Sequence, residues 1–200
     1  MIYHFCNDEF GGPFRTELAA FSRASGIPLT TVYSAKTTRA ALRRRLSLIG
    51  ARLRGLFGRV VVARDVNAPA FAASIADGDI GVVSGFNQIF KAPAIARFRL
   101  FVNVHPSVLP MYRGRTPVAD ALRRGETRTG YTIHHVTPQI DSGPIVYQAV
   151  LPLDSNDVDK IAAAIGASAA PQLRRFLESY IRGEVWQPVI IDPATVYRST

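Results

Sequence analysis

The feature that most constrains the fold is an alternation of short apolar runs with segments of helical periodicity in the first half of the chain. Apolar runs with the length of buried strands lie at 2–6, 29–33, 60–63 and 80–85. Residues 16–24 and 67–75, between such runs, have the pattern of helices. Strands that alternate with helices imply right-handed βαβ crossovers, so the pattern predicts an α/β fold with a mostly parallel sheet.

The second half continues the alternation and adds a pair of strands that flank a turn. A strand is expected at 99–104 after a helical turn at 92–95, then a helix at 117–124 that has proline in its first turn. Strands at 129–136 and 145–151 suggest an antiparallel C-terminal part, followed by a long helix at about 157–182 with a bend at Pro171 and an edge strand at 189–191. No repeat or composition shift divides the chain, so residues 1–200 are expected to form one domain.

Composition restricts the class of protein. Of 200 residues 48% are hydrophobic and 20% charged, as in an ordinary globular protein, and no run of about 18 apolar residues suggests a membrane span. The N-terminus lacks the pattern of a signal peptide, and the single cysteine, Cys6, permits no internal disulfide and is expected to be a buried thiol. A cytoplasmic location is therefore expected, and a homo-oligomer remains possible.

The net charge of +9 is unevenly distributed, because arginines are concentrated in residues 39–59. At helical spacing the apolar residues of this segment share one face and its arginines the other, which favours a surface helix with a solvated basic face. A clamp for an anionic substrate and contact with a membrane surface remain alternatives. Nucleic acid is not expected as a partner, because stacking aromatic residues are nearly absent and no nucleic-acid motif occurs. The arginines are Arg39, Arg43, Arg44, Arg45, Arg52, Arg54 and Arg59.

Two short motifs carry the candidate chemistry. Asn103 and His105 are two residues apart, so both side chains point to the same face of a strand that Pro106 ends. A turn formed by Asp141 and the three residues after it follows later in the chain. Alone, each motif is more typical of a strand end or a turn. Together they offer an oxyanion stabiliser, a proton donor and an orienting carboxylate.

With these motifs in place, the chain resembles the folate-dependent formyltransferases. The resemblance is nearly continuous from residue 79 to 153 and includes the runs 84–90, 101–114, 129–134 and 141–145. It implies a Rossmann-like three-layer domain that transfers a formyl group from 10-formyltetrahydrofolate to a primary amine. By the same resemblance, Asn103, His105 and Asp141 occupy the family's catalytic positions.

The roles that the resemblance implies are chemically consistent. Attack of an amine on the formyl carbon creates an oxyanion, which the amide of Asn103 and a protonated His105 would stabilise. Asp141 would favour the imidazolium form of His105. No metal is expected, because the formyl donor is already activated and no cluster with metal-ligand spacing occurs.

The resemblance also predicts binding residues. Gln88, Ile89 and Phe90, together with Val136, should line the folate pocket. Plain core packing is the alternative for these side chains. His134 matches a histidine near the family's active site, whereas His135 should face the other side of its strand.

The chain departs from the family pattern at places that bear on the identity of the acceptor. The acceptor is expected to be a small-molecule amine, and an anionic amine is one option. Purine-pathway members have a phosphate-binding loop after the first strand, but residues 7–13 of this chain include two carboxylates, which would repel a phosphate. Those members also have polar substrate contacts in the terminal helix, but residues 161–170 here are mostly alanine. Purine synthesis is therefore disfavoured. The extra C-terminal domain of tRNA-acting members is not expected here. An amino sugar or sugar nucleotide is the favoured acceptor. A glycinamide ribonucleotide formyltransferase, a formyltetrahydrofolate hydrolase and a non-catalytic folate-binding module remain alternatives.

Overall fold

The computed structural model describes residues 1–7, 10–35 and 58–197, which form one mixed sheet in the strand order β3-β2-β1-β4-β5-β6-β7. Strands β1 to β5 are parallel, and β6 and β7 pair antiparallel. This arrangement confirms the predicted α/β, Rossmann-like fold. The strands are β1 (Ile2–Cys6), β2 (Leu29–Ser34), β3 (Arg59–Ala63), β4 (Asp79–Ser84), β5 (Phe98–His105), β6 (Arg128–His135) and β7 (Ile145–Pro152).

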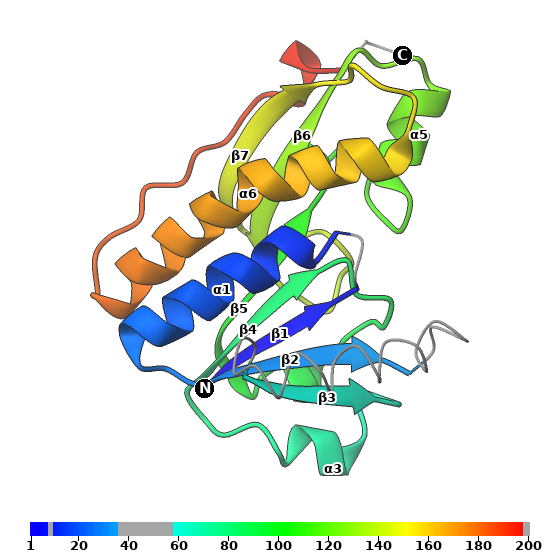
Figure 1. Cartoon of the computed structure of the whole chain (residues 1–200). Coiled ribbons are helices and arrows are strands. Elements are labelled where there is room, and N and C mark those ends of the chain that lie inside the picture. Colours follow the sequence, from blue (N-terminus) through cyan, green and yellow to red (C-terminus); the bar gives the residue numbers. More distant parts are fainter. Residues whose placement is uncertain (8–9, 36–57, 198–200) are drawn as a thin grey trace.

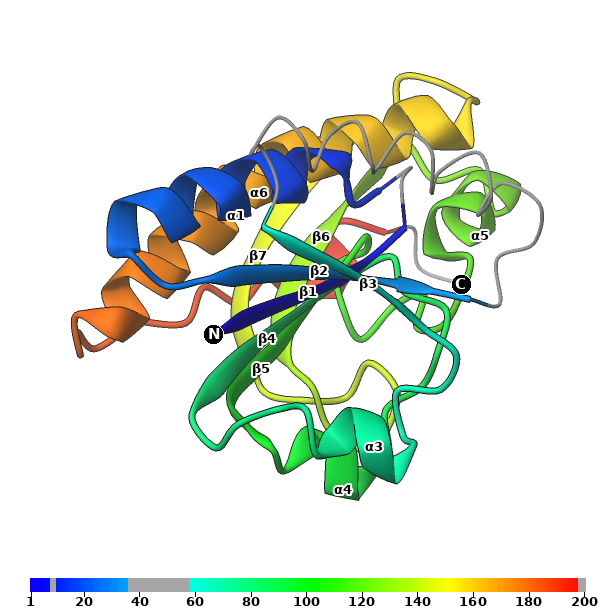
Figure 2. The same cartoon turned by 60° about the horizontal axis from the view of Figure 1, so that its bottom comes forward.

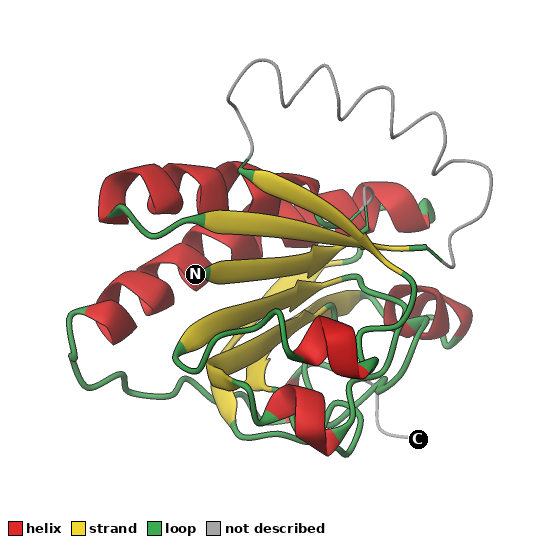
Figure 3. Cartoon of the chain, turned by 90° about the horizontal axis from the view of Figure 1, so that it is seen from below, coloured by secondary structure: helices red, strands yellow, loops and turns green. Residues whose placement is uncertain are grey.

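Helices cover both faces of the sheet (Figures 1, 2 and 3). The long helices α1 (Gly12–Ser25) and α6 (Val158–Ile181) pack side by side on one face. The short helices α3 (Pro69–Ala72) and α4 (Ala92–Ile95) lie on the other, and α5 (Pro117–Arg123) lies near the start of α6. A 3₁₀ helix, η1 (Pro193–Thr195), follows a segment that returns beside β7.

The central strands are buried on both faces, which explains their continuous apolar runs. Every residue of β1, β2 and β4 is buried, as is typical of parallel strands between two helical layers. Beneath α1 and α6 the core is mainly aliphatic. On the opposite face Phe5 is surrounded by Phe71, Phe86, Phe90 and two further phenylalanines.

Helix ends follow local chemistry. Helix α1 begins at Gly12, four residues before the predicted start, because Pro13 fits a first turn where no amide donor is needed. It ends at Gly26, whose φ of 70° suits a left-handed cap. Helix α6 begins after Asp157, whose side chain accepts from the amides of Asp159 and Lys160, and it continues through Pro171 to Ile181, close to the predicted bounds.

Two predicted elements are shorter than expected. The helix predicted at 67–75 is only α3, because the amides of Ser74 and Ile75 bond three residues back and close the segment as turns. The strand predicted at 189–191 is a single bridge from Val189 to Tyr147, since the Ile191 amide donates to the Gln148 side chain. The predicted basic helix lies outside the described residues, except that Arg59 begins β3.

Candidate active site

A cavity of about 500 Å³ opens at the carboxyl ends of the central strands. Strands β1 and β4 are neighbours in the sheet, but the chain proceeds from them in opposite directions along it. Ligands of open α/β sheets bind at such a switch point. The cavity is lined by Asn7 after β1, Gly85 after β4, the end of β5, and the first turns of α5 and α6.

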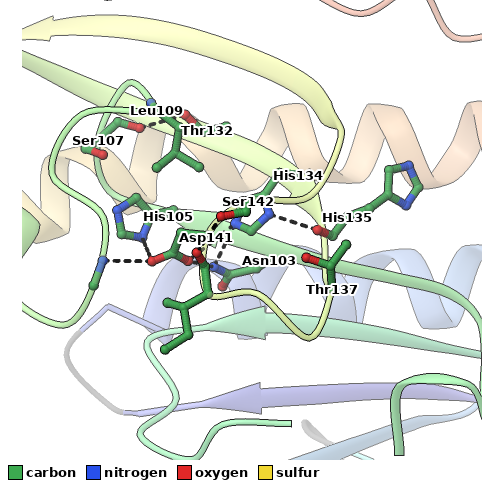
Figure 4. A network of polar contacts seen from close by, with 12 residues as sticks. Asn103, His105, Ser107, Leu109, Thr132, His134, His135, Thr137, Asp141 and Ser142 are labelled. Atoms are coloured by element: carbon green, nitrogen blue, oxygen red, sulfur yellow. Dashed lines mark hydrogen bonds and ion pairs between the residues drawn. The ribbon is translucent and has the colours of Figure 1, made fainter. Parts of the chain in front are cut away.

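The pairing of β5 with β6 brings the polar residues of the cavity together. Asn103 and His105 lie on the same face of β5, and β6 places His134 opposite Asn103 and Thr132 opposite His105. His105 and His134 are almost completely buried. A strand pair therefore presents one amide and two imidazoles to the same end of the sheet (Figure 4).

Asp141 reaches this group from the loop between β6 and β7. Its Oδ2 lies 3.4 Å from Nδ1 of His105, and its Oδ1 lies 3.3 Å from Nδ2 of Asn103. The residue adopts a left-handed φ of 48°, which aspartate tolerates better than most residues. Gly143 lets the loop lie against β6, because a Cβ there would be 1.8 Å from the His135 carbonyl oxygen. The predicted grouping of Asn103, His105 and Asp141 is present.

Hydrogen bonds assign the orientation of Asn103 and His134. Nδ1 of His134 faces the carbonyl oxygen of His135 at 2.9 Å and must carry the proton. Its Nε2 then accepts from Nδ2 of Asn103 at 3.1 Å. The Asn103 amide nitrogen thus donates to both His134 and Asp141, and its Oδ1 accepts no hydrogen bond within the described part of the chain. The His135 ring points away from the cluster (Figure 4).

His105 faces hydrogen-bond acceptors at both ring nitrogens. Its Nε2 donates to the carbonyl oxygen of Tyr112 at 2.8 Å, and Nδ1 faces Asp141. Burial lowers the pKa of His105 and outweighs Asp141 and the Tyr112 carbonyl, which raise it. His134 and Arg113 lower it further. The ring is therefore neutral more often than an exposed histidine would be, with its proton on Nε2.

Asp141 keeps its negative charge in this environment. Burial raises its pKa. His134, whose Nε2 lies 3.6 Å from Oδ1 of Asp141 and donates when that ring is charged, the charged form of His105 and the Gly114 amide outweigh burial, so the net shift is downward. The Gly114 amide donates to Oδ2 at 2.9 Å. The site thus combines a fixed carboxylate, an imidazole and an amide at the wall of one cavity.

The residues predicted to bind folate all line the same cavity, although their side chains differ in character. Gln88 points inward: Oε1 accepts from the Val66 amide, and Nε2 donates to Ser34 and to the Ala63 carbonyl. Phe90 packs on Phe5, with ring centroids 4.8 Å apart. Ile89 is exposed at the rim. A contact of Gln88 with a ligand would therefore involve its backbone, and the role of this loop stays a prediction.

Sequence reasoning missed two backbone groups that orient the site. They are the Tyr112 carbonyl, presented by a left-handed residue with φ of 55°, and the Gly114 amide, in a residue with φ of 105°. The only local signal was Gly114 itself, since glycine is favoured at such φ values. A backbone carbonyl leaves no residue type to recognise, so the role of Tyr112 was not visible in the sequence.

Membrane-spanning helices and metal-binding clusters are both absent from the described part of the chain. No helix there has the length and apolarity to cross a membrane. No group of three or more histidine, cysteine or acidic side chains in residues 1–7, 10–35 and 58–197 has an arrangement that could hold a metal ion.

Comparison with known proteins gives the same class as the fold and the site. Residues 59–171, more than half of the chain, match the family model described as formyl transferase. A methionyl-tRNA formyltransferase of Roseiflexus castenholzii is 35% identical over 130 residues, which are 63% of this chain and 42% of that protein. One from Chloroflexus aggregans is 40% identical over 109 residues, 54% of this chain and 35% of that protein. The chain spans less than half the length of these relatives.

Solved structures share the fold at lower identity. Glycinamide ribonucleotide transformylase 1 of Symbiobacterium toebii has a TM-score of 0.68 at 22% identity, and the match covers 96% of this chain and 93% of that chain. The chain belongs to the formyl transferase family, whose members are folate-dependent one-carbon transferases.

Proposed function

We propose that this chain transfers a formyl group from 10-formyltetrahydrofolate to a primary amine of a small molecule, an amino sugar carried on a nucleotide. The observation that carries the proposal is the convergence of Asn103, His105 and Asp141 at the wall of a cavity of about 500 Å³. That volume lies within the range of small-molecule sites. The family uses 10-formyltetrahydrofolate as formyl donor.

One wall of the cavity suits the flat rings of a folate. The lining includes Ile89 and Ile140, which are 62% and 51% exposed, and the apolar side chains of Phe86 and Val136. Exposed apolar side chains that rim a cavity are typical of ligand sites. This wall fits the donor, with the formyl group directed towards Asn103 and His105.

In the proposed reaction the amine forms a bond to the formyl carbon, and the bond from that carbon to the folate nitrogen breaks. One proton leaves the amine and one is returned to the folate nitrogen, so the exchange is balanced. Negative charge develops on the formyl oxygen during this exchange. His105 as imidazolium would stabilise that charge through its own positive charge, because its two ring nitrogens face the Tyr112 carbonyl and Asp141. Asp141 would stabilise the imidazolium against burial, which favours the neutral ring in the protein without substrate.

Asn103 fits a donor role if it changes one partner. Both hydrogens of its amide nitrogen are engaged, with His134 and with Asp141. One of them must turn to the formyl oxygen to stabilise the developing charge. Its Oδ1 faces no donor within the described residues, so it can accept from the attacking amine.

The acceptor wall supports a compact molecule with apolar faces and an anionic part. Phe10, Val118, Val158 and Ala162 supply apolar side chains to this wall, onto which the C–H faces of a sugar ring can pack. Arg115 also lines the cavity and suits a diphosphate. A sugar N-formyltransferase from Shewanella sp. has the same fold, with a TM-score of 0.69 at 18% identity and coverage of 96% of this chain and 73% of that chain.

The proposal is tested with purified protein, 10-formyltetrahydrofolate and a panel of amines. Amine-dependent production of tetrahydrofolate is measured with amino-sugar nucleotides and glycinamide ribonucleotide, and formate release is followed in parallel. We expect turnover with an amino-sugar nucleotide and its loss in His105→Ala. Efficient formylation of glycinamide ribonucleotide without any turnover of amino-sugar nucleotides would overturn the acceptor, and formate release without an amine would identify a hydrolase.

A second candidate acceptor is the amine of methionyl-tRNA. It is favoured by the identities of 35% and 40% to methionyl-tRNA formyltransferases, which exceed those of the solved sugar and purine enzymes. The net charge of +9 is compatible with an RNA ligand. Adding methionyl-tRNA to the panel distinguishes the two acceptors. Formylation of methionyl-tRNA should weaken steeply as the salt concentration rises, because binding to RNA releases counterions.

A further inference from the structure

The loop that follows β5 supplies the second partner of His105. It covers residues 106–116 without a helix or strand, and Tyr112 within it has a φ of 55°. That conformation is unusual for a bulky residue without a stabilising context. It turns the Tyr112 carbonyl towards Nε2 of His105, at 2.8 Å. The position of this carbonyl determines which acceptor the ring meets on the side opposite Asp141.

The loop is held by hydrogen bonds from distant parts of the chain. The Val108 amide donates to the hydroxyl of Tyr197 at 2.8 Å. The Leu109 amide donates to Oγ1 of Thr132 at 3.0 Å, and the Leu109 carbonyl accepts from Gln148 at 2.9 Å. These contacts fix the first half of the loop, and Figure 4 shows Thr132 bonded to it.

Aromatic contacts and a buried carboxylate hold the second half. The Tyr112 hydroxyl donates to Glu126 at 2.6 Å, and Glu126 is buried. The Tyr112 ring packs edge-to-face on the Tyr197 ring, with centroids 4.9 Å apart. Burial and Glu126 raise the pKa of Tyr112, so its hydroxyl keeps the proton that it donates. Tyr197 therefore contacts both halves of the loop.

None of these three side chains lines the cavity. The cavity wall contains His105 and Gly114 but not Tyr112, Glu126 or Tyr197. A ligand in the cavity thus meets His105 and not the residues behind it. Any effect of the three on the reaction has to act through the position of the imidazole.

We propose that Tyr197, Tyr112 and Glu126 are positioning residues, which hold the Tyr112 carbonyl against Nε2 of His105 and thereby keep Nδ1 directed at Asp141. The catalytic meaning rests on the proposed function, but the positioning itself is a property of the protein without substrate. The charged and titratable groups that face His105 are Asp141, His134 and Arg113. None of them is altered by the variants used below.

Nuclear magnetic resonance of ¹⁵N-histidine-labelled protein tests the positioning directly. In the wild type, His105 should carry its neutral-state proton on Nε2. In Tyr197→Phe and Tyr112→Phe, the proton should be shared with Nδ1 and the titration midpoint of His105 should fall, because the Tyr112 carbonyl raises its pKa. Tyr147→Phe is the matched control, since it removes a hydroxyl from a ring that stacks on Tyr131 away from this loop.

Glu126 provides a rescue experiment. Glu126→Gln keeps an oxygen that can accept from Tyr112 and should retain the His105 spectrum, whereas Glu126→Ala should shift it. Each spectrum is recorded well below the thermal midpoint of that variant, so that loss of stability does not imitate loss of position. His105 spectra that match the wild type in both phenylalanine variants and in Glu126→Ala would overturn the proposal.

Kinetics separate this inference from the proposed function. With the acceptor from the amine panel, Tyr197→Phe should lower kcat about threefold to tenfold, the range of one net hydrogen bond. KM for the folate should change less than about twofold, because the side chain does not line the cavity. A shifted spectrum in a protein without formyl transfer would leave the positioning valid and reject the proposed function. Formyl transfer by the wild type, together with His105 spectra that are unshifted in the variants, would leave the proposed function valid and reject the positioning.

Discussion

Two buried histidines of the same sheet have different environments. His4 on β1 has no exposed surface, and His105 on β5 is 3% exposed. Among residues 1–7, 10–35 and 58–197, His4 has the Ser84 hydroxyl as its partner, at 2.7 Å, and its Nδ1 has none. Burial, with a smaller effect of Arg15, lowers its pKa to about 3. For His105, burial acts in the same direction, but a carboxylate and a carbonyl oppose it.

The difference shows what makes a buried imidazole useful. Burial alone keeps the ring neutral, so His4 can only support the structure. The antiparallel end of the sheet adds Asp141, which returns part of the basicity to His105 and faces a cavity. If the proposed function holds, His4 on β1 serves stability, whereas His105 at the junction of β5 with β6 serves the chemistry.

The largest expected effect is that of His105→Ala on turnover. The substitution removes the proposed stabiliser of negative charge, and loss of one such donor costs about 10²–10³ in rate. Steady-state kinetics with the acceptor from the amine panel would measure it, with folate binding followed by thermal shift. Turnover of the variant within tenfold of the wild type would contradict the catalytic role that distinguishes His105 from His4.

Asp141→Asn tests the carboxylate that distinguishes the two sites. Asparagine tolerates the left-handed φ of 48° and keeps similar size, so the loop should retain its course. Without the charge the pKa of His105 should fall further, and kcat should drop by about tenfold to 10²-fold. The titration of His105 by nuclear magnetic resonance and the pH dependence of kcat would measure both. An unchanged midpoint would mean that Asp141 does not control His105.

His4 should affect the pH dependence of stability and not the chemistry. Its folded-state pKa of about 3 lies below the ordinary value of 6.5, so its contribution is complete above pH 6.5 and is lost as pH falls towards 3. Between about pH 7.5 and pH 5 this amounts to a loss of about 2 kcal/mol in the free energy of unfolding. Urea unfolding at the two pH values should show a smaller loss in His4→Gln. Equal losses in the variant and the wild type would contradict the buried neutral state.

Gln88→Ala gives the smallest expected effect and tests the parallel half at the cavity itself. The change leaves the Val66 amide and the Ser34 hydroxyl without this partner, at a cost of about 1–2 kcal/mol in the free energy of unfolding. Because the side chain points inward, kcat should change less than about threefold. Denaturant unfolding would measure the change in the free energy of unfolding, and steady-state kinetics would measure kcat. A large rise in KM for the folate with normal stability would show that Gln88 contacts the ligand.

Residues close in sequence were the predictable part of the site. Asn103 and His105 could be placed on one face because a strand repeats every two residues, and Pro106 marked the strand's end. Their pairing with Asp141 was expected from the two motifs and supported by the family resemblance, and it depends on the loop between β6 and β7. The inward orientation of Gln88 was not predictable, because its partners Ser34, Ala63 and Val66 come from other elements.

The sequence alone determined the alternation of elements, the parallel sheet and the family, since these follow from local periodicity and from contiguous motifs. Only the tertiary structure decided how His105 is held. Its partners are a backbone carbonyl at residue 112 and a carboxylate at residue 141, and the carbonyl is fixed by Glu126 and Tyr197. Burial sets the pKa of an imidazole, and burial is a property of the folded chain that no local pattern contains.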